Sequence, residues 1–309
     1  MSRILVCGSI AYDHIMEFPG YFKDHILPDK IHALNISFLV NTLKKLRGGT
    51  APNIAYNLAM IGLKPVIAGT AGQDFLSYRS WLNENGVDTD YIRVLDDDYT
   101  ASCFITTDMN SNQITGFYPG AMSKDIEISI KGIEDEISMA IIAPTEPDAM
   151  IKWASECQEI GRSYLFDPGM QIPRLSCVDL INGIMNAKIA VFNEYEYNLM
   201  LEKTGLLEEE ILKNVEILVE TQGEKGSIIR CGKEVVHIPS AKPLKVVDPT
   251  GAGDAFRAGL LKGYFEGGSL EKMGRLANVA AVYAVEHVGG QSHNYTLEEF
   301  NERYNENFK

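Results

Sequence analysis

Short apolar runs alternate with segments of helical periodicity along most of the chain. The runs Ile4–Cys7 and Ala140–Ala143 contain no charged residue, which is typical of strands buried on both faces of a sheet. Helical patterns cover residues 51–61 and 148–160. Strands that alternate with helices in this way indicate βα units and a mostly parallel sheet. The chain is therefore predicted to have an α/β fold.

The alternation continues toward the C-terminus and predicts further elements of both kinds. The predicted strands are 66–68, 164–166, 189–192 and 217–219, and the predicted helices are 75–85, 194–204, 254–265 and 270–285. Ligands of parallel sheets bind beyond the carboxyl ends of the strands, so the site is expected at that edge.

Two segments interrupt the pattern. Residues 13–45 contain Pro19-Gly20 and Pro28-Asp29, and residues 100–118 contain two β-rich runs around Asn110-Ser111-Asn112. Because Asn and Ser favour turns, the second segment is predicted to be a β-hairpin. Together the two segments are interpreted as a small β lid. The α/β domain then comprises residues 1–12, 46–99 and 119–309.

Composition limits the classes of function. The 309 residues carry a formal net charge of −14, which argues against nucleic acid or an anionic membrane surface as the main partner. No apolar stretch reaches the roughly 18 residues of a membrane-spanning helix. The five cysteines have no C-x-x-C spacing and are expected to be buried free thiols in a reducing compartment, which favours a cytoplasmic location.

The segment 247–259 carries the strongest chemical signal. The small residues Gly251, Ala252 and Gly253 let a ligand approach the backbone closely. The helix predicted after them places their N–H groups at a helix N-terminus, which favours a phosphoryl group. Asp254 stands beside these donors and is predicted to accept a proton from an attacking alcohol. The alternative is a first-turn aspartate that only stabilises the helix dipole.

A second glycine-containing segment precedes the helix at 51–61. Gly48 and Gly49 permit close contact with a ligand, and Asn53 offers both a donor and an acceptor for a diol. The alternative for Asn53 is an N-terminal helix residue that bonds to its own backbone.

These two segments resemble the two signatures of the PfkB, or ribokinase-like, family of carbohydrate and nucleoside kinases. Their order and spacing match, and the resemblance extends from Gly8 to about Gly290. Within that family the chain is most similar to bacterial adenosine kinases of the mycobacterial type, in the runs 8–14, 37–40, 117–123 and 248–259. The resemblance implies a ribokinase-like fold with a small β-sheet lid, and ATP and Mg²⁺ as cofactors.

The resemblance also implies residues that bind the acceptor. Asp13, just after the first strand, is expected to hold the ribose hydroxyls, because an ionised carboxylate accepts two hydrogen bonds from a cis-diol. Ser9, Gly49 and Asn53 are expected beside it. The alternatives are a turn aspartate at position 13 and a serine at position 9 that merely closes the turn.

Three further residues are predicted to recognise a base. Phe104 and Phe117, on the predicted hairpin, would sandwich a purine, and Gln171 would bond to the edge of that base. The alternative is that both aromatic residues belong to the core of the lid.

Metal sites are implied by the resemblance at two places. Asn193 and Glu196 resemble the N-x-x-E motif that holds the water shell of Mg²⁺. The same spacing fits an N-cap with a capping box, and both interpretations are compatible. Asp248 and Thr250 resemble a site for a monovalent cation such as K⁺.

The loop 221–226 resembles the loop that contacts ATP in the family. Thr221, Gly223 and Gly226 are its predicted contacts, whereas Lys225 is expected to face solvent. The glycines alone are only turn signals. Asn278, on the helix 270–285, is a further candidate on the nucleotide side.

The predicted reaction transfers phosphate from ATP to the 5′-hydroxyl of adenosine and gives ADP and AMP. The alternative within the family is a sugar kinase for ribose, fructose or a related ketose. A Rossmann dehydrogenase is disfavoured, because residues 8–12 lack the G-x-G-x-x-G pattern. Retention of Asp254 argues against a ligand sensor without turnover. Free strand edges favour a homodimer joined through the lid, with a monomer as the alternative.

Overall fold

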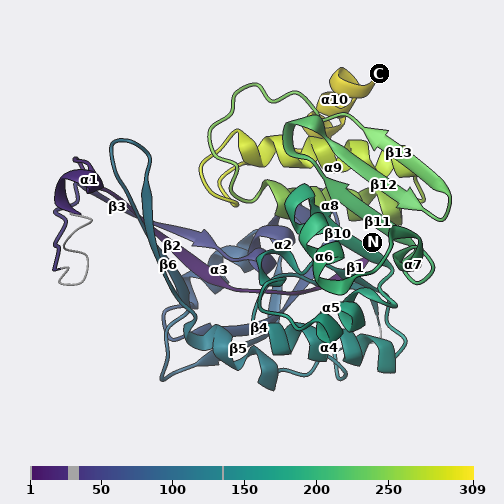
Figure 1. The fold of residues 1–309 in the computed structure, drawn as a ribbon, viewed down its shortest axis with the longest axis horizontal. Coiled ribbons are helices and arrows are strands. Elements are labelled where there is room, and N and C mark those ends of the chain that lie inside the picture. The colour runs from purple at the N-terminus through teal and green to yellow at the C-terminus, as the bar shows by residue number, and fades with distance from the viewer. Residues whose placement is uncertain (1, 27–34, 134–135) are drawn as a thin grey trace.

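The strands form a large sheet and a small sheet that projects from it (Figure 1). The structure is a computed structural model that describes residues 2–26, 35–133 and 136–309. The strands of the large sheet are β1 (Arg3–Cys7), β4 (Lys64–Gly72), β5 (Asp88–Leu95), β8 (Ile137–Ile142), β9 (Tyr164–Phe166), β10 (Ile189–Asn193), β11 (Ile217–Thr221), β12 (Ser227–Cys231) and β13 (Glu234–Ile238). Their order is β13-β12-β11-β10-β9-β8-β1-β4-β5.

All neighbouring strands from β11 to β5 are parallel, and β12 and β13 add an antiparallel edge. Helices cover both faces of the large sheet. The central strand β1 is accordingly apolar on both of its faces. Ile4 and Val6 pack on one side, and Leu5 and Cys7 on the other. The first side holds α2 (Thr50–Met60), α3 (Leu76–Glu84), α8 (Ala252–Phe265), α9 (Leu270–Val285) and α10 (Leu297–Phe308). The second holds α4 (Pro147–Glu159), α5 (Cys177–Ile184), α6 (Glu194–Thr204) and α7 (Glu208–Ile211).

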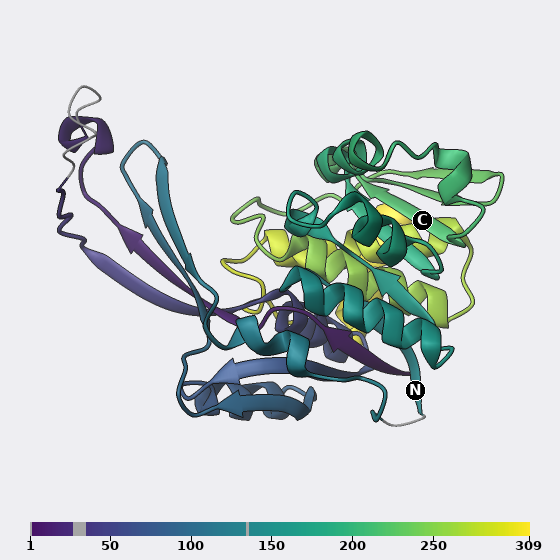
Figure 2. The ribbon, with the colours of Figure 1, turned by 60° about the horizontal axis from the view of Figure 1, so that its bottom comes forward.

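The small sheet extends away from the helices, as both ribbon views show (Figures 1 and 2). Its strands are β2 (Ala11–Glu17), β3 (Thr42–Gly48), β6 (Ala101–Thr107) and β7 (Gln113–Tyr118), in the order β3-β2-β6-β7. The short helix α1 (Phe22–His25) follows β2. The ribokinase-like arrangement expected from the sequence, a mostly parallel sheet with a smaller separate one, is confirmed.

The hairpin predicted within residues 100–118 is confirmed. Strands β6 and β7 are antiparallel, and the turn between them is organised by Asp108. Its carboxylate accepts the backbone N–H groups of Asn110 and Asn112, both at 2.9 Å. Asp108 therefore acts as an Asx-type turn residue, which is why the polar cluster marked this turn in the sequence.

The predicted elements agree with the structure most closely where their periodicity is strong. Helices α6 and α9 have the predicted bounds. Strands β5, β12 and β13 and helices α1, α5, α7 and α10 were not predicted. The small sheet includes Ala11 and extends to Gly48, slightly beyond the predicted segment 13–45. Pro28-Asp29 lies outside the described residues, and the division into domain and lid stays a prediction.

The cysteines differ in their surroundings. All five are free thiols; Cys7 and Cys157 are buried, as expected. Cys177 is exposed, and Cys103 and Cys231 are partly exposed, so the expectation of burial is wrong for these three. Cys177 is the first residue of α5, an element that the sequence pattern did not reveal.

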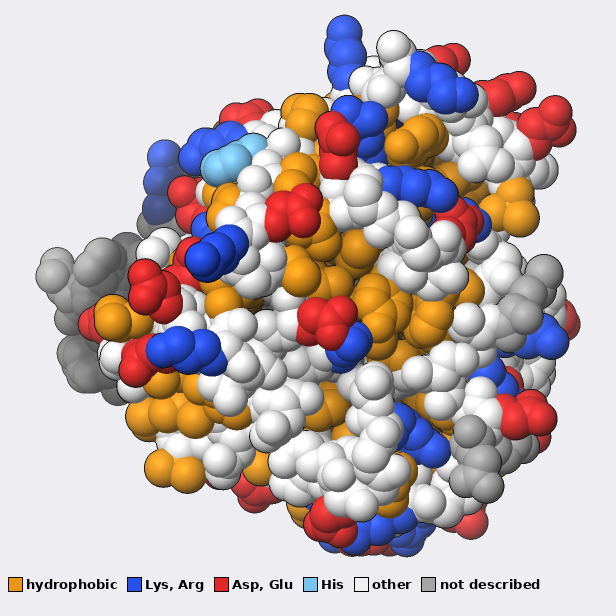
Figure 3. All heavy atoms as spheres, turned by 90° about the vertical axis from the view of Figure 1, so that its right-hand side faces the viewer, with side chains coloured by type: hydrophobic (Ala, Val, Ile, Leu, Met, Phe, Trp, Pro, Cys, Tyr) orange, Lys and Arg blue, Asp and Glu red, His pale blue; other side chains and the backbone are white. Residues whose placement is uncertain are grey.

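The surface carries both signs of charge. On the face drawn in Figure 3, Lys and Arg side chains are interspersed with Asp and Glu side chains and form no continuous basic area. Within the described part of the chain, no helix is long and apolar enough to cross a membrane.

Candidate active site

The candidate residues gather where the parallel strands end. Ser9 follows β1, Asp167 follows β9, Asn193 is the last residue of β10, and Thr221 is the last residue of β11. The carboxyl ends of parallel strands meet at one edge of a sheet, so these residues line the edge at which ligands bind. The N-terminus of α8, with Asp254, belongs to the same group through Arg257 and Asp167.

The turn before α8 requires glycine. Gly251 has a φ of 78°, and a Cβ there would lie 2.5 Å from the Cα of Gly290. One of the three N–H groups predicted at this helix N-terminus is already engaged, because Ala252 donates its N–H to the Pro249 carbonyl at 3.2 Å. The N–H groups of Gly253 and Asp254 lie in the first turn, where the helix provides no acceptor. Gly253 is exposed, so these donors are accessible to an anion.

Asp254 lies in the first turn of α8 and is half-buried. Its Oδ2 accepts a hydrogen bond from Asn53 Nδ2 at 2.8 Å. Burial raises the pKa of Asp254 to about 7, although the Arg257 charge and the Asn53 hydrogen bond oppose the shift. The negative charge of Asp167 adds to the increase in this pKa. A carboxylate with a pKa near the operating pH is well suited to accept a proton from an alcohol.

Arg257 organises this end of α8, a role that the sequence analysis did not assign. Its Nε donates to Asp167 Oδ2, and its Nη1 donates to the Gly253 carbonyl at 2.7 Å. Both members of the ion pair are buried. The available signal was an arginine among small and apolar residues, together with an aspartate directly after a predicted strand, because a buried charge requires a partner.

Asp13 lies near the segment that precedes α8, because the charge of Asp248 acts on its carboxyl group. Burial raises the pKa of Asp13 to about 6, and the negative charge of Asp248 contributes further. The side chain lies over Gly48, where a Cβ would be 2.5 Å from Asp13 Oδ2. Gly49 has a φ of 92°, and a Cβ there would lie 2.4 Å from the Ser9 carbonyl oxygen. Gly48 is therefore explained by the close approach of the Asp13 side chain, and Gly49 by its positive φ and its close contact with backbone.

Ser9 forms a reciprocal pair with Thr50. Ser9 Oγ accepts the Thr50 N–H, and Thr50 Oγ1 accepts the Ser9 N–H, both at 3.1 Å. Ser9 therefore closes the turn, as the alternative interpretation held, and its contact with an acceptor stays a prediction.

Asn53 is fully engaged within the protein. Besides donating to Asp254, it accepts a hydrogen bond from Gln291 Nε2 at 2.6 Å through its Oδ1 atom. Only 5% of Asn53 is exposed. These contacts place Asn53 against Asp254, the candidate base. The binding of a diol by Asn53 stays a prediction.

Asn193 and Glu196 form the capping box of α6. Asn193 Oδ1 accepts the Glu196 N–H, and Glu196 Oε2 accepts the Asn193 N–H, both at 2.8 Å. Burial, followed by the charge of Asp167, raises the pKa of Glu196. The charge of Arg257 acts in the opposite sense and lowers this pKa. A single carboxylate here fits water-mediated Mg²⁺ binding, in which few direct carboxylates are needed.

The predicted cation site at Asp248 fits only in part. Its two carboxylate oxygens accept the N–H groups of Thr250 at 2.9 Å and Gly289 at 2.8 Å. Burial acts to raise the pKa of Asp248, but these hydrogen bonds hold it below its usual value. The nearby Val285 carbonyl accepts two backbone N–H groups, from Val247 and Asp248. The residues predicted for K⁺ are thus already used to join this segment to the end of α9.

The loop 221–226 is placed beside β13. A Cβ on Gly226 would lie 2.0 Å from the Ile238 carbonyl oxygen, so packing alone requires this glycine. Gly223 has open space around its Cα, and Thr221 Oγ1 lies 3.5 Å from the Phe192 carbonyl oxygen. Lys225 faces solvent, as expected, with 66% of its side chain exposed.

Asn278 is buried within α9, with 4% of its surface exposed. Its Nδ2 donates to the Gly274 carbonyl at 2.9 Å and lies 3.4 Å from Ser227 Oγ. These contacts are structural, and a contact of Asn278 with a nucleotide stays a prediction.

The prediction that Phe104 and Phe117 sandwich one purine is wrong. Phe117 pairs with Cys103, so Phe117 and Phe104 belong to opposite faces of the small sheet. Phe104 stacks on His14, with ring centroids 4.6 Å apart. Phe117 shares a face with Asp13, because Asp13 also pairs with Cys103. Side-chain direction follows from strand register, which the sequence did not define.

The face that carries Asp13, Leu46, Cys103 and Phe117 is called the inner face. Near its base this face is directed toward the segment after α9, because Leu46 lies against Gly289. The opposite, outer face carries His14, Lys45, Phe104 and Tyr118, which line a groove of about 650 Å³ with Asp74, Tyr99 and Ser102. Gln171 is 9% exposed and accepts from Arg174 Nη1 at 3.1 Å, which leaves its amide N–H₂ as the group able to bond a base.

Comparison with known proteins identifies the family. The model of the pfkB family of carbohydrate kinases matches residues 4–297. The chain belongs to this family. It is therefore a phosphotransferase that acts on a nucleoside or sugar hydroxyl group.

Several relatives of this pfkB kinase match over nearly their whole length. The nucleoside kinase of Burkholderia thailandensis, solved in complex with inosine, is 38% identical, covers 99% of this chain and 98% of its own, and has a TM-score of 0.87. The nucleoside kinase of Methanocaldococcus jannaschii is 29% identical over 98% of this chain and 97% of its own. The ribokinase of Bacillus subtilis is 25% identical over 94% and 95%.

Replacement of Asp254 by Asn tests its role as base. The amide keeps the size of the side chain but cannot accept the proton, so kcat should fall by roughly 10²–10⁴-fold. ADP release in a coupled assay measures the rate, and circular dichroism with thermal unfolding checks the fold. A folded variant with near-normal kcat would show that Asp254 is not the base.

Proposed function

We propose that this pfkB kinase transfers phosphate from ATP to the 5′-hydroxyl of a purine ribonucleoside, with adenosine as the substrate and AMP and ADP as products. The observation that carries the proposal is Asp254, half-buried at the start of α8 with a pKa of about 7. Exposed N–H donors beside it suit a phosphoryl group that carries negative charge. The carboxylate and these donors supply positioning and charge stabilisation, which are the main requirements of phosphoryl transfer.

The inner face of the small sheet favours a nucleoside over a free sugar. Asp13, Cys103 and Phe117 form one row across β2, β6 and β7. Neighbouring strands lie about 4.8 Å apart, so Phe117 is displaced by roughly 10 Å from the strand of Asp13. A ribose held at Asp13 would direct its base along this row. A free sugar would not reach Phe117, which is 51% exposed and ready to stack on a base.

Two comparisons bear on the acceptor. The Burkholderia thailandensis kinase was solved with inosine, which supports a purine nucleoside. The similarity to ribokinase keeps a sugar as the second candidate, because both sugars and nucleosides carry the hydroxymethyl group that Asp254 would activate. The free N–H₂ of Gln171 can donate to an acceptor atom on adenine or hypoxanthine, so this residue does not separate the two bases.

ATP and Mg²⁺ are the proposed cofactors. The Burkholderia thailandensis kinase has also been solved with ADP and inosine, which supports an adenine nucleotide. Asn193 and Glu196 would hold the water shell of Mg²⁺, and the ion would neutralise charge on the phosphates when bound. Thr221 and Gly223 would contact ATP. Cation dependence through Asp248 and Thr250 is open to a direct test, in which K⁺ is replaced by choline in the assay.

A homodimer through the small sheet is also proposed. Five large apolar side chains on this sheet are exposed by 43–65%. Phe117 lies on the inner face, and the other four lie on the outer face: Leu43, Phe104, Ile114 and Tyr118. Exposed apolar clusters of this kind mark interaction surfaces. A second copy of the chain would cover them and leave the inner faces free for substrate.

A panel of adenosine, inosine, ribose and fructose with ATP and Mg²⁺ tests the acceptor. Adenosine should have the highest kcat/KM, with ribose lower by at least about tenfold, because only the nucleoside reaches Phe117. Product phosphorylation measured by chromatography gives the order. Efficient turnover of ribose without turnover of adenosine would establish a sugar kinase instead.

Replacement of Phe117 by Ala should raise KM for adenosine by roughly 5- to 150-fold, the loss expected for one stacked base, and change ribose use little. Phe104→Ala is the matched control, because Phe104 lies on the outer face. Steady-state kinetics with both acceptors separate the two variants. Equal effects of the two substitutions would contradict the assignment of the inner face.

Ile114→Lys places a charge in the exposed apolar cluster and should convert the dimer to a monomer. Sedimentation equilibrium measures the mass of both proteins. A wild-type protein that is monomeric at micromolar concentration would contradict the proposed dimer.

A further inference from the structure

Gln291 lies between the candidate base and the small sheet. Its Nε2 donates to Asn53 Oδ1 and to the Tyr78 hydroxyl, both at 2.6 Å. Only 8% of Gln291 is exposed. Tyr78 in turn donates its hydroxyl hydrogen to the Gly48 carbonyl at 2.9 Å. Gly48 is the last residue of β3, where the small sheet joins the chain that leads into α2.

The hydrogen bonds that link Gly48, Tyr78, Gln291, Asn53 and Asp254 allow only one assignment of donors and acceptors. A carbonyl oxygen only accepts, so the Gly48 carbonyl fixes the Tyr78 hydroxyl as a donor on that side. The lone pairs of Tyr78 then face Gln291, which must present its N–H₂ group. That group also faces Asn53, so Asn53 presents its oxygen to Gln291 and its N–H₂ to Asp254. A flipped Asn53 would place an oxygen against a carboxylate, which is repulsive.

The segment that carries Gln291 is anchored independently by α2. Tyr56 donates to the His293 carbonyl at 2.6 Å, and Asn57 Oδ1 lies 2.8 Å from His293 Nε2. Asn53, Tyr56 and Asn57 occupy one side of α2, at spacings of three and four residues. Gly290 has no room for a side chain, since a Cβ there would lie 2.6 Å from the Asn53 side chain. The position of Gln291 is therefore set before any ligand binds.

We propose that Gln291 is a positioning residue, which orients the Asn53 amide so that its N–H₂ group faces Asp254 and thereby couples the base to the junction of the small sheet at Gly48. This inference depends on the proposed role of Asp254 as base. Gln291 has no described contact with Asp254 and acts only through Asn53.

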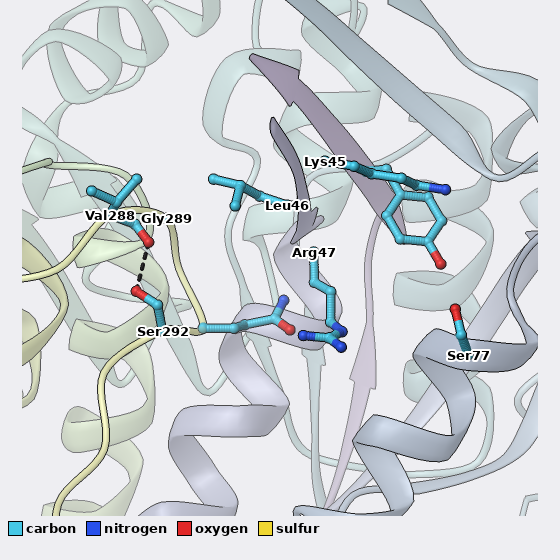
Figure 4. Close-up of a pocket in the computed structure, with 9 residues that line it drawn as sticks. Lys45, Leu46, Arg47, Ser77, Val288, Gly289 and Ser292 are labelled. Atoms are coloured by element: carbon cyan, nitrogen blue, oxygen red, sulfur yellow. Dashed lines mark hydrogen bonds between the residues drawn. The ribbon is translucent and has the colours of Figure 1, made fainter. Parts of the chain in front are cut away.

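The oriented amide acts together with charged groups around Asp254. Arg257 on α8 favours the ionised carboxylate, whereas Asp167 after β9 disfavours it. Glu196 on α6 interacts with Arg257. Gln291 also lines a cleft of about 260 Å³. The other residues that line this cleft include Lys45, Arg47 and Ser292 (Figure 4). A change at Gln291 alters the neutral donor at Asp254 and leaves Arg257, Asp167 and Glu196 in place.

Two substitutions test the proposal. Gln291→Met keeps the length of the side chain and removes the amide, so Asn53 is free to rotate. Gln291→Glu reverses the polarity, because a carboxylate accepts from Asn53 N–H₂ and turns the Asn53 oxygen toward Asp254. We expect kcat to fall by roughly 10-fold for Met and more for Glu, with the dissociation constant for adenosine changed by less than about threefold.

The pH dependence distinguishes positioning from a merely structural role. Loss of the Asn53 donor disfavours ionised Asp254, so the acid limb of the kcat/KM profile should move to higher pH, by about half a unit or more. Tyr56→Phe is the matched control. It removes a hydrogen bond that anchors the same segment, and it should lower Tm without moving the acid limb.

The outcomes separate the inference from the proposed function. A wild-type protein that phosphorylates no acceptor would overturn both. An active wild type whose Gln291 variants fold, keep kcat within twofold and keep the same acid limb would overturn the positioning role alone. If both Gln291 variants fail to fold, Tyr78→Phe decides. This substitution removes only the hydroxyl oxygen of Tyr78 and should shift the acid limb in the same direction by a smaller amount. If the acid limb does not move, the proposal is overturned.

Discussion

The contact between Asn53 and Asp254 is the constraint on which the site depends. It joins residues 201 positions apart and places a carboxylate in a half-buried position with one hydrogen-bond donor. Burial alone disfavours the charge, so the fold must supply compensating groups at fixed positions. Arg257 supplies a charge from α8, and Asn53 supplies a neutral donor from α2. The balance of these effects leaves the pKa of Asp254 at about 7. Such a value suits a group that exchanges protons at physiological pH.

Close backbone packing makes this arrangement possible. Gly251 and Gly290 approach until no side chain fits between them, and Gly48 passes directly under Asp13. The first contact joins the start of α8 to the segment after α9, and the second joins the end of β3 to β2. Each glycine therefore does more than permit a turn. It allows backbone from one segment to support a functional side chain of another.

The side chains of the small sheet alternate between two faces of different character. Its inner face carries Asp13 and Phe117, whereas the outer face carries the exposed apolar cluster that includes Phe104 and Ile114. Because strand residues alternate in direction, one thin layer can face a substrate on one side and another protein surface on the other. The junction at Gly48 is connected to Asp254 through Tyr78, Gln291 and Asn53.

Local pattern in the sequence was enough for the α/β class, the bounds of α6 and α9, the hairpin after Thr100 and the position of Asp254 at a helix start. These features depend on periodicity and on turn chemistry within a few residues. The short strands β12 and β13, at the edge of the sheet, lack a strong apolar run and were missed. The face of Phe104, the ion pair of Arg257 with Asp167 and the bridge formed by Gln291 were decided only in three dimensions. Strand register and contacts between residues 90 or more positions apart depend on how the whole chain packs, and no local pattern encodes them.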